Sequence, residues 1–138
     1  MSERKLKYRK KISIITERLA DLPKKIDSDL KKDATLFRVQ IAIEAAMDII
    51  AMLVKDHGRE VSDDYHNIEM LEDLKIIRSV LADELKKLNG LRNAIVHKYN
   101  KFEEKHVFDN KEKIVNVLNT FLSILEHDIK TILKDDKS

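Results

Sequence analysis

The scarcity of residues that break helices is the feature that most constrains the fold of this chain. Its 138 residues include 2 glycines and 1 proline, namely Gly58, Gly90 and Pro23. Glycine and proline supply most sharp turns in proteins, and both disfavour helix interiors. A chain with so few of them is expected to form long α-helices joined by short connections. Because no segments resemble paired strands, we predict an all-α protein.

Apolar residues recur at helical spacing in several segments of the chain. The expected helices are residues 3–20, residues 29–56, a short helix capped by Asp63 or Asp64 that runs through Leu74, residues 77–97 and residues 109–133, with residues 100–106 as a connection. Pro23 follows the first segment and Gly58 follows the second, as expected just beyond helix ends. We predict an antiparallel up-and-down bundle of four long helices and one short helix, forming a single domain over residues 1–138.

Residues 36–54, within the second expected helix, are apolar on nearly all sides. A helix of that kind is buried on more than one face. A bundle of this size has few other helices with which to cover such a surface. We therefore expect a homodimer, most simply one with two-fold symmetry.

Charge and composition indicate which partners and which cell compartment to expect. The 27 basic and 25 acidic residues leave a net charge of +2, which is too small to indicate nucleic-acid binding by itself. A basic stretch over residues 4–11 is interpreted as a solvated helix face in preference to a phosphate contact. The chain has no cysteine and no segment apolar enough to span a bilayer, so we expect a cytoplasmic protein that does not associate with membranes.

Histidines outside the fourth helix show no metal-binding spacing. They are His57, His66, His106 and His127. Motifs such as H-E-x-x-H, which place two histidines on one helix face, are not present. We expect surface or capping roles for these four residues, and no metal or other cofactor.

A polar cluster lies near the end of the fourth expected helix. Arg92, Asn93, His97 and Tyr99 fall within an otherwise aliphatic stretch. Burying such groups is costly unless they are paired or used. For any one of them a structural role at a helix end is the simpler interpretation, because basic residues are favoured there. Together they favour function, since an arginine and a histidine suffice in principle to cleave RNA without a metal ion.

The pattern R-N-x-x-x-H-x-Y formed by these four residues closely resembles the signature of HEPN-domain proteins, and more narrowly of the HepT-like toxin family. Residues 41–50 are similar to that family's second helix, and Gly90-Leu91 and residues 100–108 also fit. The resemblance covers roughly residues 30–130. It implies a HEPN-like fold, and homodimers with the motif at a shared cleft.

The resemblance also implies a function. HepT-like proteins are RNase toxins of type VII-like toxin–antitoxin pairs, in which a minimal nucleotidyltransferase antitoxin adenylylates the tyrosine of the H-x-Y element. On this basis RNA is the expected substrate, with tRNA as one candidate, and Tyr99 is the expected site of modification. The structural alternative for Tyr99 is a packing residue whose hydroxyl caps a carbonyl.

The chemistry assigned to the cluster is metal-independent cleavage of RNA. His97 would act as general base or general acid, because an unperturbed histidine has a pKa of about 6.5. Arg92 would stabilise the charge that builds on the phosphate, and Asn93 would orient the histidine or the phosphate. Arg92 and His97 lie five residues apart, about 140° around a helix. Either Arg92 curls round the helix, or each histidine works beside an arginine of the other subunit.

Two acids and a glycine are candidates for supporting roles. Glu44 and Asp48 are either part of a narrow solvent-facing stripe with Gln40, or one of them pairs with Arg92 and orients it. Gly90 suggests that its backbone packs tightly against a neighbour, since glycine in a helix costs about 1 kcal/mol relative to alanine.

Two other functions compete with the ribonuclease toxin. One is a non-catalytic HEPN module that binds nucleotides or a nucleotidyltransferase partner, and the other is a plain helical interaction protein. The presence of His97 favours the enzyme over the plain scaffold. A neighbouring gene for a small nucleotidyltransferase would exclude the scaffold, and only an activity assay separates the enzyme from the binding module.

Overall fold

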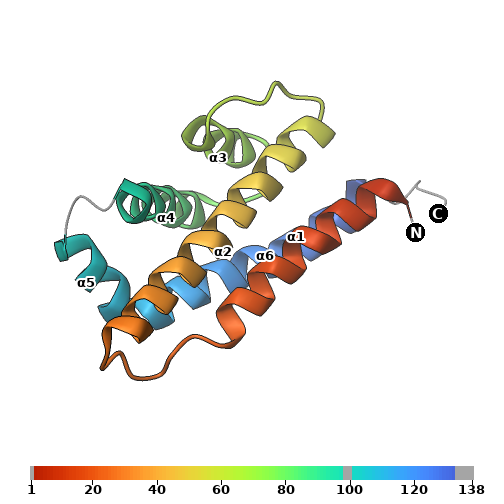
Figure 1. Cartoon of the computed structure of the whole chain (residues 1–138). Helices are drawn as coiled ribbons and strands as arrows, with labels where there is room; N and C mark the ends of the chain where they lie inside the picture. The colour runs from red at the N-terminus through yellow and green to blue at the C-terminus, as the bar shows by residue number, and fades with distance from the viewer. Residues whose placement is uncertain (1, 98–100, 133–138) are drawn as a thin grey trace.

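The computed structural model of the chain describes residues 2–97 and 101–132, and the side chains of residues 101–103 and 132 are not described. Every regular element in these residues is a helix. The helices are α1 (Glu3–Ala20), α2 (Asp29–Asp56), α3 (Asp64–Asp73), α4 (Ser79–His97), α5 (Lys101–Asp109) and α6 (Lys111–Ile132). They form an antiparallel bundle, which confirms the predicted all-α class (Figure 1). None of the helices in the described residues is long and apolar enough to cross a membrane.

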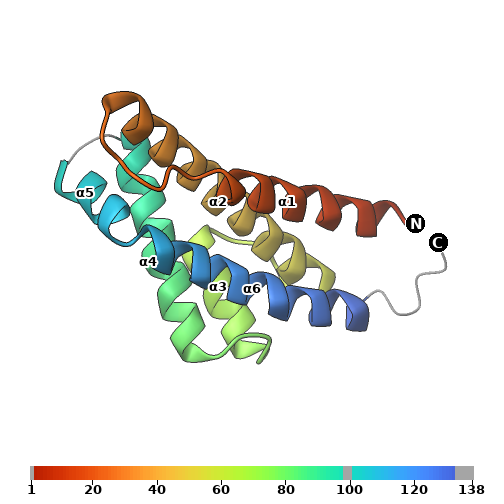
Figure 2. The ribbon, with the colours of Figure 1, turned by 90° about the horizontal axis from the view of Figure 1, so that it is seen from below.

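The α2 helix is the centre of the bundle. It contacts each of the other five helices, with α1 along one side and α3 and α4 along the other (Figures 1 and 2). Its buried side chains include Val39, Ile43, Ile50 and Leu53, none of which is exposed. The chain's own helices therefore cover most of the apolar surface of α2, although Phe37 is 51% exposed. The argument that α2 needs a second subunit loses most of its basis, and the dimer stays a prediction.

Side-chain caps define where three helices begin. The hydroxyl of Ser2 accepts a hydrogen bond from the Lys5 amide, and that of Ser28 accepts one from the Lys31 amide. Asp63, rather than Asp64, caps α3, because its Oδ1 accepts from the His66 amide at 2.8 Å. Such caps satisfy amide groups that have no partner within the helix.

A short helix replaces the connection that was expected over residues 100–106. The α5 helix runs over Lys101–Asp109 and packs against α2, α4 and α6. The prediction was wrong because the local sequence is mostly polar, and burial of Val107 in the core supplies the apolar contact that stabilises this turn of chain. After Asn110, α6 begins at Lys111. Tyr99 lies outside the described residues.

A polar cluster around the buried Tyr8 joins α1, α2 and α6 at one end of the bundle. The Tyr8 hydroxyl donates to Asp56 Oδ2 at 2.5 Å, and Arg4 lies 3.3 Å from the same carboxylate. His57 Nε2 lies 3.1 Å from Asp128 Oδ2. Burial, reinforced by the bond to Asp56, raises the pKa of Tyr8 well above its usual range, so the phenol stays neutral. This end of the bundle is therefore held by hydrogen bonds as well as by apolar packing.

Candidate active site

Arg92 extends from α4 toward α3. Its Nη2 lies 2.9 Å from Asp64 Oδ2, and the two side chains are 23% and 32% exposed. Arg92 Nε is buried, and in the described part of the chain it has no hydrogen-bond partner. The guanidinium is therefore held on one side by a carboxylate and keeps an unused donor. A half-buried pair of this kind is stronger than a surface pair, because water screens it less.

Side-chain hydrogen bonds hold the start of α3, where Asp64 lies. The buried side chain of Asn67 accepts a hydrogen bond from the Ser62 amide at 2.8 Å and donates to the Ser62 carbonyl at 3.1 Å. Asp63 caps the helix immediately before Asp64. The hydrogen bond from the His66 amide, with that from the His66 ring, lowers the pKa of Asp63. Asp64 stands in the first helical turn, where the helix dipole also favours a carboxylate.

His97 is the last residue of α4, and its side chain is exposed. Seven residues separate it from Gly90, so the two lie within about 20° of each other around the helix. Arg92 lies about 140° away from His97 by the same geometry. Because Arg92 is bound to Asp64, it does not curl round α4 toward His97 in this structure. Asn93 is also exposed and lies next to Arg92 in sequence.

The structure separates the other expected supporting residues from Arg92. Asp48 is exposed and its Oδ2 lies 2.7 Å from Lys11 Nζ, while Glu44 accepts a hydrogen bond from Gln40 at 3.5 Å. The interpretation in which Glu44 or Asp48 pairs with Arg92 is therefore wrong for this chain, since Asp64 takes that place. Their arrangement fits the alternative of a polar stripe on α2.

Gly90 does not support a close packing contact within the chain. A Cβ atom added there would meet no atom within 4 Å, apart from the helix's own backbone and adjacent residues. The expected close neighbour of Gly90 is therefore not another element of the described chain, and a neighbour from a second subunit stays a prediction. Gly90 instead lines a hollow between α4, α5 and α6.

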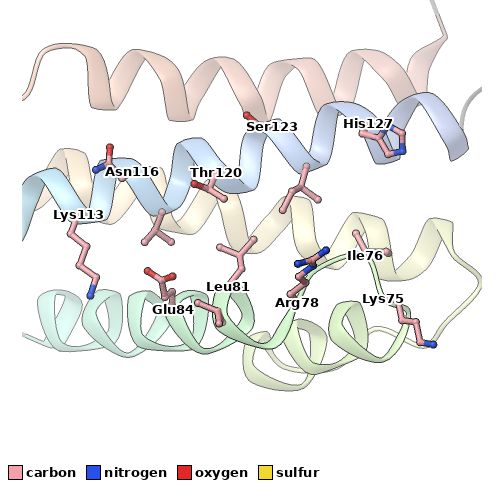
Figure 3. A pocket seen from close by; sticks show the side chains of 13 residues that line it. Lys75, Ile76, Arg78, Leu81, Glu84, Lys113, Asn116, Thr120, Ser123 and His127 are labelled. Atoms are coloured by element: carbon pink, nitrogen blue, oxygen red, sulfur yellow. The ribbon is translucent and has the colours of Figure 1, made fainter.

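A groove runs between α4 and α6. It consists of two adjoining hollows of about 730 and 590 Å³, which share Glu84, Lys113 and Val117 in their walls. Figure 3 shows the first hollow, with Lys113 reaching from α6 toward α4 and the Arg78 guanidinium directed into the space between the helices. We call this feature the α4–α6 groove. Gly90 and Ala94 line its second hollow.

The family of the chain follows from its sequence as a whole. The family model described as ribonuclease HepT-like matches residues 6–125. The chain belongs to this family. A protein of Archaeoglobus fulgidus named as a candidate RNase is 40% identical over 129 residues, which cover 94% of this chain and 98% of the relative. A candidate RNase of Methanocaldococcus jannaschii is 46% identical over 74 residues, covering 54% of this chain and 85% of that protein. These relatives support ribonuclease activity in general.

Solved structures show that the fold is HEPN-like. A cytosolic protein of Bacillus subtilis, YutE, superposes with a TM-score of 0.82 at 20% identity, covering 94% of this chain and 92% of that one. The toxin–antitoxin complex MntA-HpeT contains a chain that superposes with a TM-score of 0.76 at 20% identity. The match covers 88% of this chain and 98% of that one. A tri-AMPylated HEPN toxin of Shewanella oneidensis in complex with MNT antitoxin superposes with a TM-score of 0.66 at 21% identity. The match covers 92% of this chain and 99% of that one. At these identities the likeness concerns the fold.

Sequence reasoning missed Asp64 as the partner of Arg92 and missed the basic lining of the α4–α6 groove. Asp64 lies 28 residues before Arg92, and only the packing of α3 on α4 brings them together. The sequence near Asp64 shows only an acidic residue at the start of a short helix. A helix cap accounts for such a residue as well as a bond to Arg92 does.

The Asp64–Arg92 pair is expected to couple the two helices energetically. A double-mutant cycle with Asp64→Ala and Arg92→Ala should give a coupling of about 1 kcal/mol, because the pair is charged and half buried. The measurement is the free energy of unfolding in urea. The exposed Lys11–Asp48 pair is the matched control, and its cycle should give about 0.5 kcal/mol or less. Equal coupling in the two cycles would show that Asp64 does not hold Arg92 in solution.

Proposed function

We propose that this chain is an endoribonuclease that cleaves RNA without a metal ion and acts as the toxin of a toxin–antitoxin pair. The observation that carries the proposal is the end of α4. There an exposed histidine, His97, follows Arg92 and Asn93 within two helical turns, in a chain of the ribonuclease HepT-like family. An imidazole and a guanidinium supply the proton transfer and charge stabilisation that RNA cleavage requires.

The proposed reaction uses the RNA's own 2′-hydroxyl. A base, for which His97 is the candidate, takes the proton of the 2′-hydroxyl, and the 2′-oxygen attacks the adjacent phosphorus. The bond from phosphorus to the 5′-oxygen breaks, and the 5′-oxygen takes up a proton from an acid. The products are a 2′,3′-cyclic phosphate and a 5′-hydroxyl. A histidine serves either step, because its unperturbed pKa of about 6.5 permits both protonation states near neutral pH.

The proposed site is shared between two copies of the chain. Arg92 is held by Asp64 on the α3 side of α4, whereas His97 lies about 140° away around the same helix. A phosphate beside His97 would therefore take its arginine from a second subunit in a two-fold dimer. Arg92, whose side chain is 23% exposed, would then neutralise charge on two phosphate oxygens through the forked donors of its guanidinium group. Asn93, exposed next to Arg92, would help to position the phosphate.

The proposed partner is a nucleotidyltransferase antitoxin that adenylylates Tyr99. Support comes from the Shewanella oneidensis structure, which is described as a tri-AMPylated HEPN toxin with MNT antitoxin. Tyr99 follows the exposed end of α4 by two residues. Adenylate added there would bring negative charge close to His97. It would both block access to the site and neutralise the site's positive charge.

A chelator-resistant cleavage assay tests the activity. Unmodified protein incubated with total tRNA and a chelator is expected to cut RNA, and His97→Ala and Arg92→Ala are each expected to reduce the rate by at least 100-fold, since general acid–base catalysis alone contributes about 10²–10⁴. His57→Ala is the control, because it removes a histidine outside α4 whose partner is Asp128. Intact RNA with wild-type protein whose Tyr99 is unmodified by mass spectrometry would favour the non-catalytic binding module instead.

A modification assay tests the regulation. Incubation with the cognate nucleotidyltransferase and ATP should add adenylate to the wild-type chain and stop cleavage. The Tyr99→Phe variant should gain no adenylate, and whatever cleavage it shows should not fall when the nucleotidyltransferase is added. Tyr65→Phe, at the most exposed tyrosine of the described residues, should be modified like the wild type. Adenylate on Tyr99→Phe at the wild-type level would refute Tyr99 as the target.

A further inference from the structure

The described residues that line the α4–α6 groove carry a marked excess of positive charge. Four of them are lysine or arginine and one is an acid, Glu84, although the whole chain is nearly balanced at 27 basic and 25 acidic residues. The cations are Lys75, Arg78, Lys87 and Lys113. None of these four forms a salt bridge within the described residues, whereas Arg9, Lys11 and Arg92 elsewhere each do. The groove therefore presents cations whose charge no carboxylate of the described chain neutralises by a direct pair.

The α6 wall of the groove is made of side chains that can donate hydrogen bonds. Lys113, Asn116, Thr120, Ser123 and His127 recur at intervals of three and four residues, so they follow one stripe along the helix. All five are exposed. The stripe extends about 21 Å, at 1.5 Å per residue. A partner helix could place its apolar side chains on the groove floor, but along the α6 wall it would meet this polar stripe, which suits a polar occupant better.

Amines, guanidinium groups, hydroxyls and amides are the groups with which proteins contact the phosphates and sugars of nucleic acids. The groove floor, which includes Leu81, Val117 and Ile124, is apolar. Among the described residues that line the groove there is no phenylalanine, tyrosine or tryptophan on which a base could stack, and its only rings are those of His106 and His127. The arrangement therefore fits the sugar–phosphate backbone better than the bases. Charge complementarity thus favours RNA over a protein segment as the occupant.

The groove also leads toward the proposed catalytic histidine. Gly90 and Ala94 line its second hollow, and His97 follows Gly90 at nearly the same angle around α4. A strand lying in the groove toward the C-terminal end of α4 would pass the side of the helix on which His97 is placed. Arg92 lies on the other side, bound to Asp64.

We propose that the α4–α6 groove binds the backbone of the RNA substrate and delivers it to His97. This inference rests on the proposed ribonuclease function and adds to it the surface that holds the RNA. Arg78 and Lys113, which enter the groove from opposite walls, contact successive parts of the phosphate backbone (Figure 3). The polar stripe on α6 supplies further hydrogen bonds to phosphates and sugars.

The test compares two double variants of equal charge, each made in the full-length His97→Ala chain so that the RNA stays intact. Arg78→Gln/Lys113→Gln removes two groove cations, and Lys7→Gln/Lys10→Gln removes two exposed cations of α1. Binding of a fluorescent single-stranded oligoribonucleotide is measured by anisotropy from 0.05 to 0.5 M salt. Loss of two phosphate contacts should lower the salt slope by about 1.4 and weaken binding about 25-fold at 0.1 M salt. The α1 variant should bind like its parent.

Two results would overturn the inference. One is equal binding by the two double variants, which would remove any special role of the groove. The other is a change of oligomeric state in the groove variant alone, measured by light scattering, which would make the groove an interface between copies of the chain. The same substitutions in the active chain separate this inference from the proposed function. Wild-type protein that leaves RNA uncut contradicts the function, whereas cleavage with the same KM in both double variants contradicts the groove alone.

Discussion

Burial of the α2 helix is the constraint on which the rest of the structure depends. Its apolar side chains face several directions, and no single neighbouring helix could cover them. Five other helices do so, contributing fully buried residues such as Ile15, Ile68, Leu85, Val107 and Leu118. Each such aliphatic side chain is worth about 1.5–3 kcal/mol of burial. Because α3 and α4 must both pack on α2, they are brought against each other, and this contact places Asp64 beside Arg92.

The packing of α3 on α4 holds Arg92 away from His97. Arg92 and His97 belong to one helix, yet the helix directs them to different sides, and the bond to Asp64 keeps Arg92 on the α3 side. Asp64 itself is fixed by the Asp63 cap and by the hydrogen bonds of Asn67. The guanidinium is therefore oriented before any RNA binds. A fixed arginine stabilises a developing charge without reorganising during the reaction, provided that a phosphate is brought to it from another subunit.

Much of the fold was predictable because its signals are local. The bounds of α1 and α2 and the end of α4 at His97 were predicted correctly, since the apolar period, Pro23 and Gly58 mark them within a few residues of sequence. The α5 helix was missed because the burial of Val107, which depends on contacts with distant helices, is not visible in the local sequence. The apolar surface of α2, from which the dimer was predicted, is mostly covered by the other five helices, although Phe37 stays exposed. The dimer itself remains a prediction.

The site was predictable in its residue types but not in its contacts. Arg92, Asn93, His97 and Tyr99 are recognisable by their order along one stretch of chain. Asp64 and the groove cations Lys75, Arg78 and Lys113 are not, because each acquires its position only when α3 or α6 packs near α4. Glu44 and Asp48 looked plausible as partners of Arg92 by charge alone, and the helix packing gives them other neighbours.

The central claim is that His97 of one subunit acts with Arg92 of another, and subunit mixing tests it most directly. The Arg92→Ala and His97→Ala proteins, each inactive alone, are unfolded together, refolded as a mixture and assayed for chelator-resistant RNA cleavage. In a mixed dimer, one site would combine an intact histidine with an intact arginine, so the mixture should recover about a quarter of the wild-type activity if subunits pair at random in two-fold dimers. A mixture that contains mixed dimers and remains as inactive as its components would contradict a shared site and place both residues in one chain.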